Sequence, residues 1–470
     1  MLLSSENADP SHTPLTLTGK RYREVMASAR DRHKRCRLSS PAWALELQLP
    51  RGLLVSTIQL LMSPYDNILY HHENTELLDL LKKVAHVNQE WREMAESLPI
   101  IGQTKCFIVD TSLPQLIDSK LNVRHLVLDK IFDYTPYSEE PEVRMRQQEL
   151  EDTTLRAVSG IAALVHLTLR SFTRLDLSLL GGLENLRSLS IEFYQHSLPG
   201  VLLPLAALTL TNITLDGIDD IDCNVFAEQA QTLTSLTISR YGTLANVASL
   251  TQLIWLERLT LSHMTHISFL AQMPSLTHLD LYQSFNLTDL TPLSGLVDLN
   301  TLNLHFCDNL VDLWPLKTLT SLETLDLGGM YQLTDLSPLI PLTRLRSLRL
   351  DGCIELSDTS SLTHLPSLTV LDLTQCRRIP QLDFLSTAVK LEDLRLDSCV
   401  SLTSISPIRS CCNLRRLSMS HCIGVTDLSP LTSCQALTRF SVYPDTKITE
   451  RLDIDNMASL YWINNTRVQR

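Results

Sequence analysis

Glycine is scarce in this sequence, and the catalytic motifs built on it are missing. Only 14 of the 470 residues are glycine, which leaves little room for loops that cradle phosphate groups. The chain contains no Gly-x-x-x-x-Gly-Lys phosphate loop, no Gly-x-Ser-x-Gly turn and no His-Glu-x-x-His zinc motif. The cluster His71-His72-Glu73 lies in a polar stretch that is predicted to be a solvated loop. We therefore expect no catalytic residues, no cofactor and no metal site.

Excess positive charge, long apolar runs and a leader sequence are also lacking. The formal net charge is −12, whereas proteins that bind nucleic acid normally present a basic stripe. No stretch of eighteen apolar residues could span a membrane. The first seven residues, Met-Leu-Leu-Ser-Ser-Glu-Asn, contain neither the basic region nor the apolar core of a signal peptide. These features predict a cytoplasmic or nuclear protein that binds neither nucleic acid nor membrane.

A strand motif, Leu-x-x-Leu-x-Leu, recurs through the second half of the chain. It begins at Leu233, Leu256, Leu276, Leu299, Leu322, Leu345, Leu368, Leu391, Leu414 and Leu437. Every step is 23 residues except the one from Leu256 to Leu276, which is 20. A constant period in this range is typical of a solenoid, in which each repeat contacts only its neighbours.

The repeat at residues 322–342 shows what each unit does. Leu325 and Leu327 are two residues apart and point to one side of a strand, while Asp326 points to the other. Leucines then recur at every third residue, and Pro338 breaks any longer helix. This spacing predicts a short 3₁₀ or extended segment on the far side of the coil.

The repeat resembles the leucine-rich repeat family over most of the chain. In that family the ninth position is Asn or Cys; here it is occupied by Ser284, Cys307, Met330, Cys353, Cys376, Cys399 and Cys422. The resemblance implies an α/β solenoid with a parallel inner sheet and a short 3₁₀ or extended convex side. Less regular strands are expected at residues 123–128, 164–169, 186–191 and 205–210, and a degraded end repeat at 460–463. About fourteen strands at ~4.8 Å spacing make a sheet of roughly 60 Å.

The eleven cysteines do not form a metal or disulfide pattern. No Cys-x-x-Cys occurs, and disulfides are rare in a reducing compartment. The ninth-position cysteines are therefore predicted to be free thiols, stacked and buried like small apolar side chains.

Two amphipathic helices are predicted before the repeats. Apolar residues recur at helical spacing after Pro50 and again after the N-cap candidate Thr75. The positions that carry the pattern are Leu49, Pro50, Leu53, Leu54, Ile58, Leu61, Val84, Val87 and Trp91.

This helical pair resembles an F-box over residues 47–98. It departs from the F-box pattern in the long connection at 62–76 and in Asn88, where a small residue is usual. An F-box followed by leucine-rich repeats is the layout of substrate receptors in SCF-type cullin-RING ubiquitin ligases. The resemblance implies docking on the adaptor subunit of the ligase. The alternative is a helical cap that only shields the end of the solenoid.

The remaining segments complete the expected domain organisation. Residues 1–40 form a polar tail with a basic run at 20–37, which predicts a disordered or solvated segment, or a nuclear-targeting signal. Residues 41–100 hold the F-box-like segment, and 101–160 hold a first strand and an acidic surface loop at 133–154. The repeats occupy 161–470.

The concave face of the sheet is the candidate binding surface. The third, fifth, seventh and eighth positions of each strand are expected to be exposed there. The fifth positions form a charged ladder that alternates in sign from Asp326 to Arg395. With Asp280 earlier on the same face and Asp351 beside it, the candidate residues are Asp280, Asp326, Arg349, Asp351, Asp372 and Arg395. It is either a self-compensated structural ladder or a recognition strip for a ligand of mixed charge. The same face continues toward the C-terminus with Asp393, Asp397, Arg416, His421, Arg439 and Tyr443.

An aromatic patch occupies seventh and eighth positions on three consecutive strands. It consists of His263, Tyr282, Gln283, His305 and Phe306. The leucines already fill the core, so these side chains are either interface anchors or ordinary surface residues.

The sequence thus predicts a non-catalytic protein that binds a protein ligand on its concave face. The leading hypothesis is a ligase substrate receptor, and the alternative is a repeat scaffold with a helical cap. A third hypothesis, a secreted recognition protein, follows from Leu-Thr-Asp-Leu-Ser-Pro-Leu at 333–339, which is similar to bacterial internalins. The missing signal peptide and the cysteine pattern argue against this third hypothesis.

Overall fold

The computed structural model describes the repeat region of the chain. The described residues are 104–107, 124–129, 141–170, 175–192, 205, 208–218, 220–240, 243–443, 462–463 and 466–467. The chain divides into two compact units, residues 1–67 and 68–470, and every described residue belongs to the second. The basic tail and the F-box-like segment lie outside the described residues.

A sheet of mostly parallel strands organises this second unit, as the repeat predicts, and it has 17 strands where about fourteen were expected. Its first strands are β1 (Thr104–Phe107), β2 (His125–Asp129), β3 (His166–Arg170), β4 (Ser188–Glu192), β5 (Asn212–Asp216), β7 (Ser235–Ser239) and β9 (Arg258–Leu261). The regular 23-residue repeats add β10 (His278–Asp280), β11 (Thr301–Asn303), β12 (Thr324–Asp326), β13 (Ser347–Arg349), β14 (Val370–Asp372), β15 (Asp393–Arg395), β16 (Arg416–Ser418) and β17 (Arg439–Ser441).

The strands of the sheet pair in chain order, and all pairs but the last are parallel. The last pair joins β18 (Trp462–Ile463), which is parallel to β17, to the antiparallel β19 (Thr466–Arg467). A separate two-stranded parallel sheet joins β6 (Asp220–Asp222) to β8 (Thr243–Ala245). Neighbouring strands pair residues one repeat apart, for example Leu302 with Leu325, so equivalent positions form columns across the sheet.

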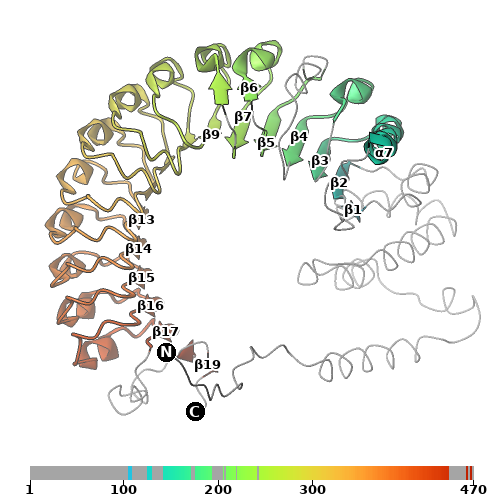
Figure 1. Ribbon diagram of the computed structural model, residues 1–470. Helices are drawn as coiled ribbons and strands as arrows, with labels where there is room; N and C mark the ends of the chain where they lie inside the picture. Colours follow the sequence, from blue (N-terminus) through green and yellow to red (C-terminus); the bar gives the residue numbers. More distant parts are fainter. Residues whose placement is uncertain are drawn as a thin grey trace, which may run out of the picture. The chain divides into compact units, whose positions relative to one another are not determined.

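Short 3₁₀ helices cover the outer face of the sheet (Figure 1). They are η2 (Leu177–Leu180), η4 (Cys223–Gln229), η5 (Val247–Gln252), η6 (Ser268–Gln272), η7 (Thr291–Gly295), η8 (Trp314–Thr318), η9 (Ser337–Leu339), η10 (Ser360–His364), η11 (Asp383–Ser386), η12 (Ser406–Ser410) and η13 (Ser429–Ser433). The concave face of the sheet is the opposite one, where the described part of the chain places no helix. The fold is that of a leucine-rich-repeat solenoid.

Three of the outer helices, η7, η9 and η13, begin where the sequence phrase Asp-Leu-Ser/Thr-Pro occurs. In η9, Asp335 Oδ1 accepts a hydrogen bond from the Ser337 backbone N–H at 2.8 Å, and Pro338 follows as the second helical residue. Proline suits this place because its fixed φ fits a helix start and its missing N–H has no helical partner. The same carboxylate contact recurs at Asp289, Asp312, Asp358 and Asp427.

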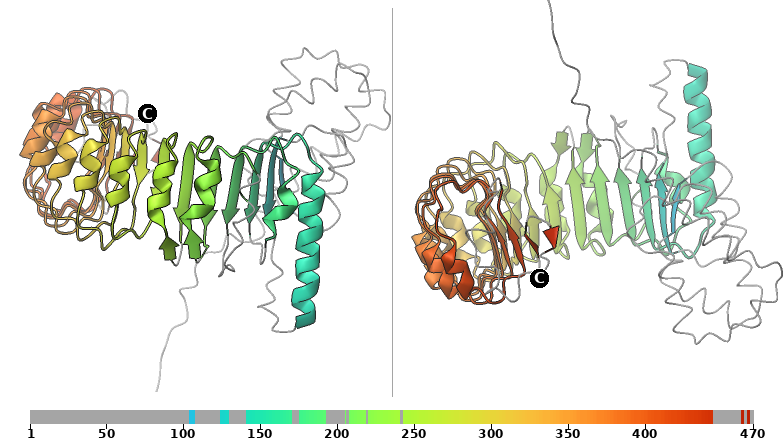
Figure 2. Two further views of the ribbon diagram at one scale, coloured as in Figure 1. Left: turned by 90° about the horizontal axis from the view of Figure 1, so that it is seen from above. Right: turned by 90° about the horizontal axis from the view of Figure 1, so that it is seen from below.

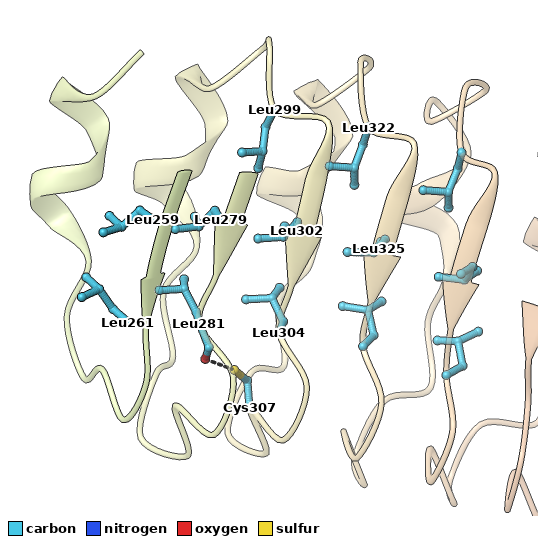
Figure 3. Close-up of a cluster of buried hydrophobic side chains, with 14 of the residues drawn as sticks. Leu259, Leu261, Leu279, Leu281, Leu299, Leu302, Leu304, Cys307, Leu322 and Leu325 are labelled. Atoms are coloured by element: carbon cyan, nitrogen blue, oxygen red, sulfur yellow. Dashed lines mark hydrogen bonds between the residues drawn. The ribbon is translucent and has the colours of Figure 1, made fainter. Parts of the chain in front are cut away.

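The core is a stack of leucine columns between the sheet and the outer helices. Leu325 and Leu327 are fully buried, as are the equivalent leucines of the neighbouring repeats. Figure 3 shows these side chains in rows, each leucine packed against its counterpart one repeat away. Burial of this kind stabilises by roughly 1.5–3 kcal/mol for each leucine side chain. It is shared between repeats, so no unit is stable without its neighbours.

Cysteines form a second column beside the leucines, which confirms the predicted buried thiols. Each thiol donates to a backbone carbonyl of the preceding repeat. Cys307 Sγ lies 3.4 Å from the Leu281 oxygen (Figure 3), and Cys422 Sγ lies 2.9 Å from the Leu396 oxygen. Equivalent bonds are made by Cys353, Cys376 and Cys399. All of these thiols are free. Three of these carbonyl oxygens, those of Leu350, Leu373 and Leu396, also accept a backbone N–H, so each thiol adds a second bond there.

Helix α7 (Pro141–Ser159) corrects the prediction of an acidic surface loop at 133–154. The helix begins at Pro141, and its described buried residues are Glu151, Thr154, Leu155 and Val158. These positions are spaced as one face of a helix. The sequence did not show this face as an apolar period, because Glu151 and Thr154 are polar and Leu155 and Val158 lie beyond the end of the predicted loop. Figure 2 shows α7 alongside the first strands of the sheet. No helix in the described residues is long and apolar enough to cross a membrane.

The early repeats are more regular than the sequence suggested. The strand expected at 205–210 is instead β5, because the motif begins at Leu210 and places Ile213 and Leu215 in the core. Motif starts then lie at Leu164, Leu186, Leu210 and Leu233, with no long interruption. The isoleucine at the central position hid the correct register.

Candidate functional site

The concave face ends in a left-handed turn at the eighth position of each repeat. Residues there have positive φ, from 48° at Arg240 to 62° at Gln375 and Ser398. Three of the described repeats place glycine at this position, Gly217, Gly329 and Gly352, where positive φ carries no steric penalty. The turn continues the ladder: the Phe306 N–H donates to the Gly328 oxygen at 2.8 Å. Eighth-position side chains are therefore presented by a rigid backbone.

At the end of several strands, the fifth-position aspartate accepts a hydrogen bond from the backbone N–H two residues later. Asp280 Oδ1 accepts from the Tyr282 backbone N–H at 3.0 Å, and Asp326 Oδ1 accepts from the Gly328 N–H at 2.9 Å. Asp372 makes the same bond to the Thr374 N–H at 3.0 Å. Such bonds satisfy a backbone donor just after the strand. These acids thus have a structural role that the predicted charge ladder did not include.

The expected exposure of the fifth positions is wrong for two of the acids. Asp326 is 9% exposed and Asp372 5% exposed, whereas Arg349 and Arg395 are exposed. The cause is the turn bond, which holds each short carboxylate against the backbone, while the longer arginine side chains extend beyond it. The ladder therefore presents guanidinium groups, with its carboxylates beneath them.

The aromatic patch is brought together as predicted, with mixed exposure. His263 is exposed, and its Nδ1 lies 3.1 Å from the Gln283 oxygen. Tyr282 and His305 are half-buried, and so is Phe306, whose ring meets His305 edge-on at 4.2 Å between centroids. Half-buried rings held by neighbours lose little conformational entropy when a ligand covers them.

Two glycines in the turn after β12, Gly328 and Gly329, make room for this patch. A Cβ on Gly328 would lie 2.4 Å from His305 Nδ1, and one on Gly329 would lie 2.2 Å from Phe306 Cδ1. The rings of His305 and Phe306 therefore lie directly over the glycine backbone.

Replacing Gly329 with Ala should displace the Phe306 ring and destabilise the protein. The substitution forces a side chain onto a backbone with φ +71° and into the ring, at a cost of about 1–3 kcal/mol. Chemical denaturation measures this loss. Gly295→Ala is the matched control because no atom lies within 4 Å of its Cβ position. Equal stability of the two variants would contradict the packing of Phe306 on Gly329.

A charged cluster adjoins the patch. His305 Nδ1 lies 3.1 Å from Asp326 Oδ1, and these two residues and Asp351 offer ligand atoms within 4.8 Å of one another. The Arg349 guanidinium lies 3.4 Å from Asp326 and 3.3 Å from Asp351, and supplies the positive charge that a bound cation would bring. Burial raises the pKa of Asp351. We assign the cluster as an ion-paired support for the concave face.

Sequence reasoning missed a further column of apolar side chains. Phe285 and Tyr331, at the tenth position, are each 41% exposed, and Ile423 in the same column is 77% exposed. Phe285 lies 6.1 Å from the His263 ring and extends the aromatic patch beyond the strand. The signal was available, because large apolar residues recur one place after the ninth position of the repeat.

Known proteins share the repeat architecture at low sequence identity. No protein-family model matches the chain, and no curated protein matches it. An internalin, InlF, of Listeria monocytogenes matches 68% of this chain and 86% of its own, with 21% identity and a TM-score of 0.46. A leucine-rich-repeat protein of Leptospira interrogans matches 76% of this chain and 93% of its own, with 19% identity and a TM-score of 0.47. A chain of the mouse RP105/MD-1 complex matches 68% and 55%, with 18% identity and a TM-score of 0.47. The fold assignment rests on this chain's own strand register.

Proposed function

We propose that the solenoid is a non-catalytic receptor that binds a protein ligand on its concave face. The aromatic patch carries this proposal. The rings of His305 and Phe306 are half-buried, backed by Gly328 and Gly329, and unnecessary to the leucine core. Aromatic side chains in such settings dominate the energetics of many interfaces. The wide sheet of aligned columns provides the surrounding area that an interface needs.

Replacing both Tyr282 and Phe306 with Ala should abolish partner capture and leave folding intact. Each truncation removes an anchor worth about 2 kcal/mol or more, so together they weaken binding by roughly a thousandfold. Affinity capture with quantitative mass spectrometry measures the loss, and circular dichroism checks the fold. Trp314→Ala is the control, because Trp314 is 51% exposed but lies on the outer helix η8. Unchanged capture by the double variant would refute the patch.

We further propose that the N-terminal helices are an F-box and that the protein is a substrate receptor of an SCF-type ligase in the cytoplasm or nucleus. The support is the pattern of Leu49, Pro50 and Leu54 in the sequence, followed by a repeat domain. In this arrangement the repeats hold a substrate close to the ubiquitin-loaded enzyme. Transfer is promoted by a higher effective concentration and not by side-chain chemistry.

A pull-down separates the receptor from a scaffold whose helices only cap the solenoid. The native protein is compared with a variant carrying Leu49→Ala, Pro50→Ala and Leu54→Ala. Recovery of adaptor and cullin subunits with the native protein, and their loss from the variant, is the expected result. Absence of these subunits from both, with other partners retained, would leave the scaffold.

A further inference from the structure

Four arginines stand on the concave face between β13 and β17. Arg349, Arg395, Arg416 and Arg439, here called the arginine row, are all exposed, and the side chains of the first three have 47%, 50% and 59% of their surface accessible. Three of the carboxylate groups beside them are hidden, while that of Asp351, beside Arg349, is 25% exposed. The side-chain exposures of Asp326, Asp372 and Asp393 are 12%, 7% and 10%. A ligand that approaches this part of the sheet therefore meets guanidinium groups first.

The ion pairs position the arginines without using their hydrogen-bond donors. Arg395 approaches Asp372 at 3.5 Å and Asp393 at 3.7 Å, and Arg416 approaches Asp393 at 3.6 Å. Within the described residues, none of the four guanidinium groups donates a hydrogen bond. Each guanidinium carries five N–H donors in a planar fork that matches a carboxylate. The row thus offers oriented donors that are still available to a ligand.

Two of the carboxylates near the arginine row, the buried Asp372 and the half-buried Asp397, have their own hydrogen-bond partners. Asp372 accepts from the Thr374 backbone N–H, and Asp397, between β15 and β16, accepts from the Ser418 hydroxyl and the Ser420 N–H. These bonds tie the acids to the backbone. A ligand carboxylate can therefore bind the arginines from above while the acids beneath them stay in place.

The strand register sets the spacing of the arginine row. Arg349 and Arg395 flank Asp372 on alternate strands, about 10 Å apart, and Arg416 pairs with Arg439 on adjacent strands, about 5 Å apart. The row crosses five strands, a span of roughly 19 Å, which about six residues of extended chain would cover. At its end the exposed Tyr443 ring meets His421 edge-on at 5.8 Å and can pack against an apolar ligand group.

We propose that the arginine row binds a short, extended, acidic segment of a partner protein. The proposal deepens the proposed function and rests on it, since it names the chemistry of a ligand for the same concave face. Local cationic groups favour a short acidic peptide, because charges beyond about 10 Å are screened in physiological salt. A long polyanion such as RNA would also meet the net charge of −12 over the rest of the chain.

Fluorescence anisotropy with a labelled peptide tests the proposal. The probe is a fluorescein-tagged octapeptide of alternating Glu and Ser. The comparison peptide is the same peptide with Gln in place of Glu. The full chain should bind the Glu peptide and lose affinity as salt rises, and the Gln peptide should bind at least about tenfold more weakly. R395Q/R416Q should weaken binding of the Glu peptide by at least about tenfold, since each substitution removes a charged contact.

Two further variants separate binding from folding. R344Q/R378Q removes the same charge from exposed arginines outside the strands, and should change affinity by less than about twofold. R395K/R416K keeps a positive charge beside Asp372 and Asp393, so its thermal melt should match that of the native protein. Lysine lacks the planar fork, so this variant should bind the peptide several-fold more weakly than the native protein.

Three results would overturn the proposal. The first is equal affinity for the Glu and Gln peptides. The second is an affinity for the Glu peptide that is unchanged in both R395Q/R416Q and R395K/R416K. The third is tighter binding of an eight-nucleotide RNA than of the Glu peptide. None of these removes the concave-face function if the Tyr282→Ala, Phe306→Ala variant still loses its partner. That function fails when capture survives substitution of both the arginine row and the aromatic patch.

Discussion

Replacing Leu325 with Asp should unfold the repeats around β12. Leu325 is fully buried in the leucine column of the central strands, and its neighbours on either side are Leu302 and Leu348. The variant loses the buried side chain and places an unpaired charge in the core, at a cost of at least about 4 kcal/mol. Because each repeat is stable only against its neighbours, the damage should spread to both adjacent units. Thermal melts followed by circular dichroism should show a lower midpoint and a broader transition.

A matched control keeps this test specific to the core. Val297→Asp introduces the same charge at a residue that is 52% exposed in the turn between η7 and β11. Its stability should stay within about 0.5 kcal/mol of the native protein. Limited proteolysis of Leu325→Asp should cut within residues 300–350 first. A cooperative melt with an unshifted midpoint for Leu325→Asp would contradict the repeat register.

The regular part of the fold was predictable because burial and period coincide there. From Leu233 onward the core positions are apolar apart from a few such as Ser284 and Thr359, so the 23-residue spacing by itself reports the stacking of β7 and β9 through β17. The prediction was wrong where buried residues do not follow the apolar period. In β5 the central leucine is replaced by Ile213, which hid the start at Leu210. In α7 the buried face includes Glu151 and Thr154, so no apolar period marks the helix.

The sequence predicted which side chains of the concave face line up across the strands, but it did not predict which of them are exposed to solvent. Alternation along a strand places Arg349 and Asp326 on the concave face, and the register confirms that they are neighbours. Which of the two reaches solvent depends on side-chain length and on the turn bond from Asp326 to the Gly328 N–H. That bond depends on the backbone after the strand, where φ becomes positive. Glycine at this repeat position, in Gly217, Gly329 and Gly352, was the hint of this in the sequence.

The two parts of the proposed binding surface have one feature in common: their exposed side chains rest on groups of a neighbouring repeat. At the aromatic patch, glycine backbone lies beneath the rings of His305 and Phe306. Along the arginine row, buried carboxylates lie beneath the guanidinium groups. In both places the residues of one repeat set the position of side chains on the next, so specificity is built between repeats. Insertion or deletion of one repeat would therefore alter the surface as well as its length.

The column of buried thiols should make the protein unusually sensitive to alkaline pH. Burial raises the pKa of Cys353 to about 12 from the ordinary value of 9.0, and it raises the pKa values of Cys376 and Cys399 as well. Between about pH 9 and 11 the unfolded chain has released these protons while the folded chain still holds them. The contribution of these thiols to the free energy of unfolding is therefore fully present below pH 9. It falls as the pH rises, by about 1.4 kcal/mol per pH unit for each thiol.

Removing three neighbouring thiols should flatten this dependence. A variant with Cys353→Ala, Cys376→Ala and Cys399→Ala should reduce the fall in unfolding free energy by about 4 kcal/mol per pH unit, as measured by urea titrations between pH 8 and about 10.5. Comparing slopes cancels the constant cost of the cavities and the titration of tyrosine and lysine. The exposed Cys412 provides the control, since Cys412→Ala should leave the slope unchanged. Equal slopes for the triple variant and the native protein would mean that the thiols ionise before the repeats unfold, and that the column is open to solvent.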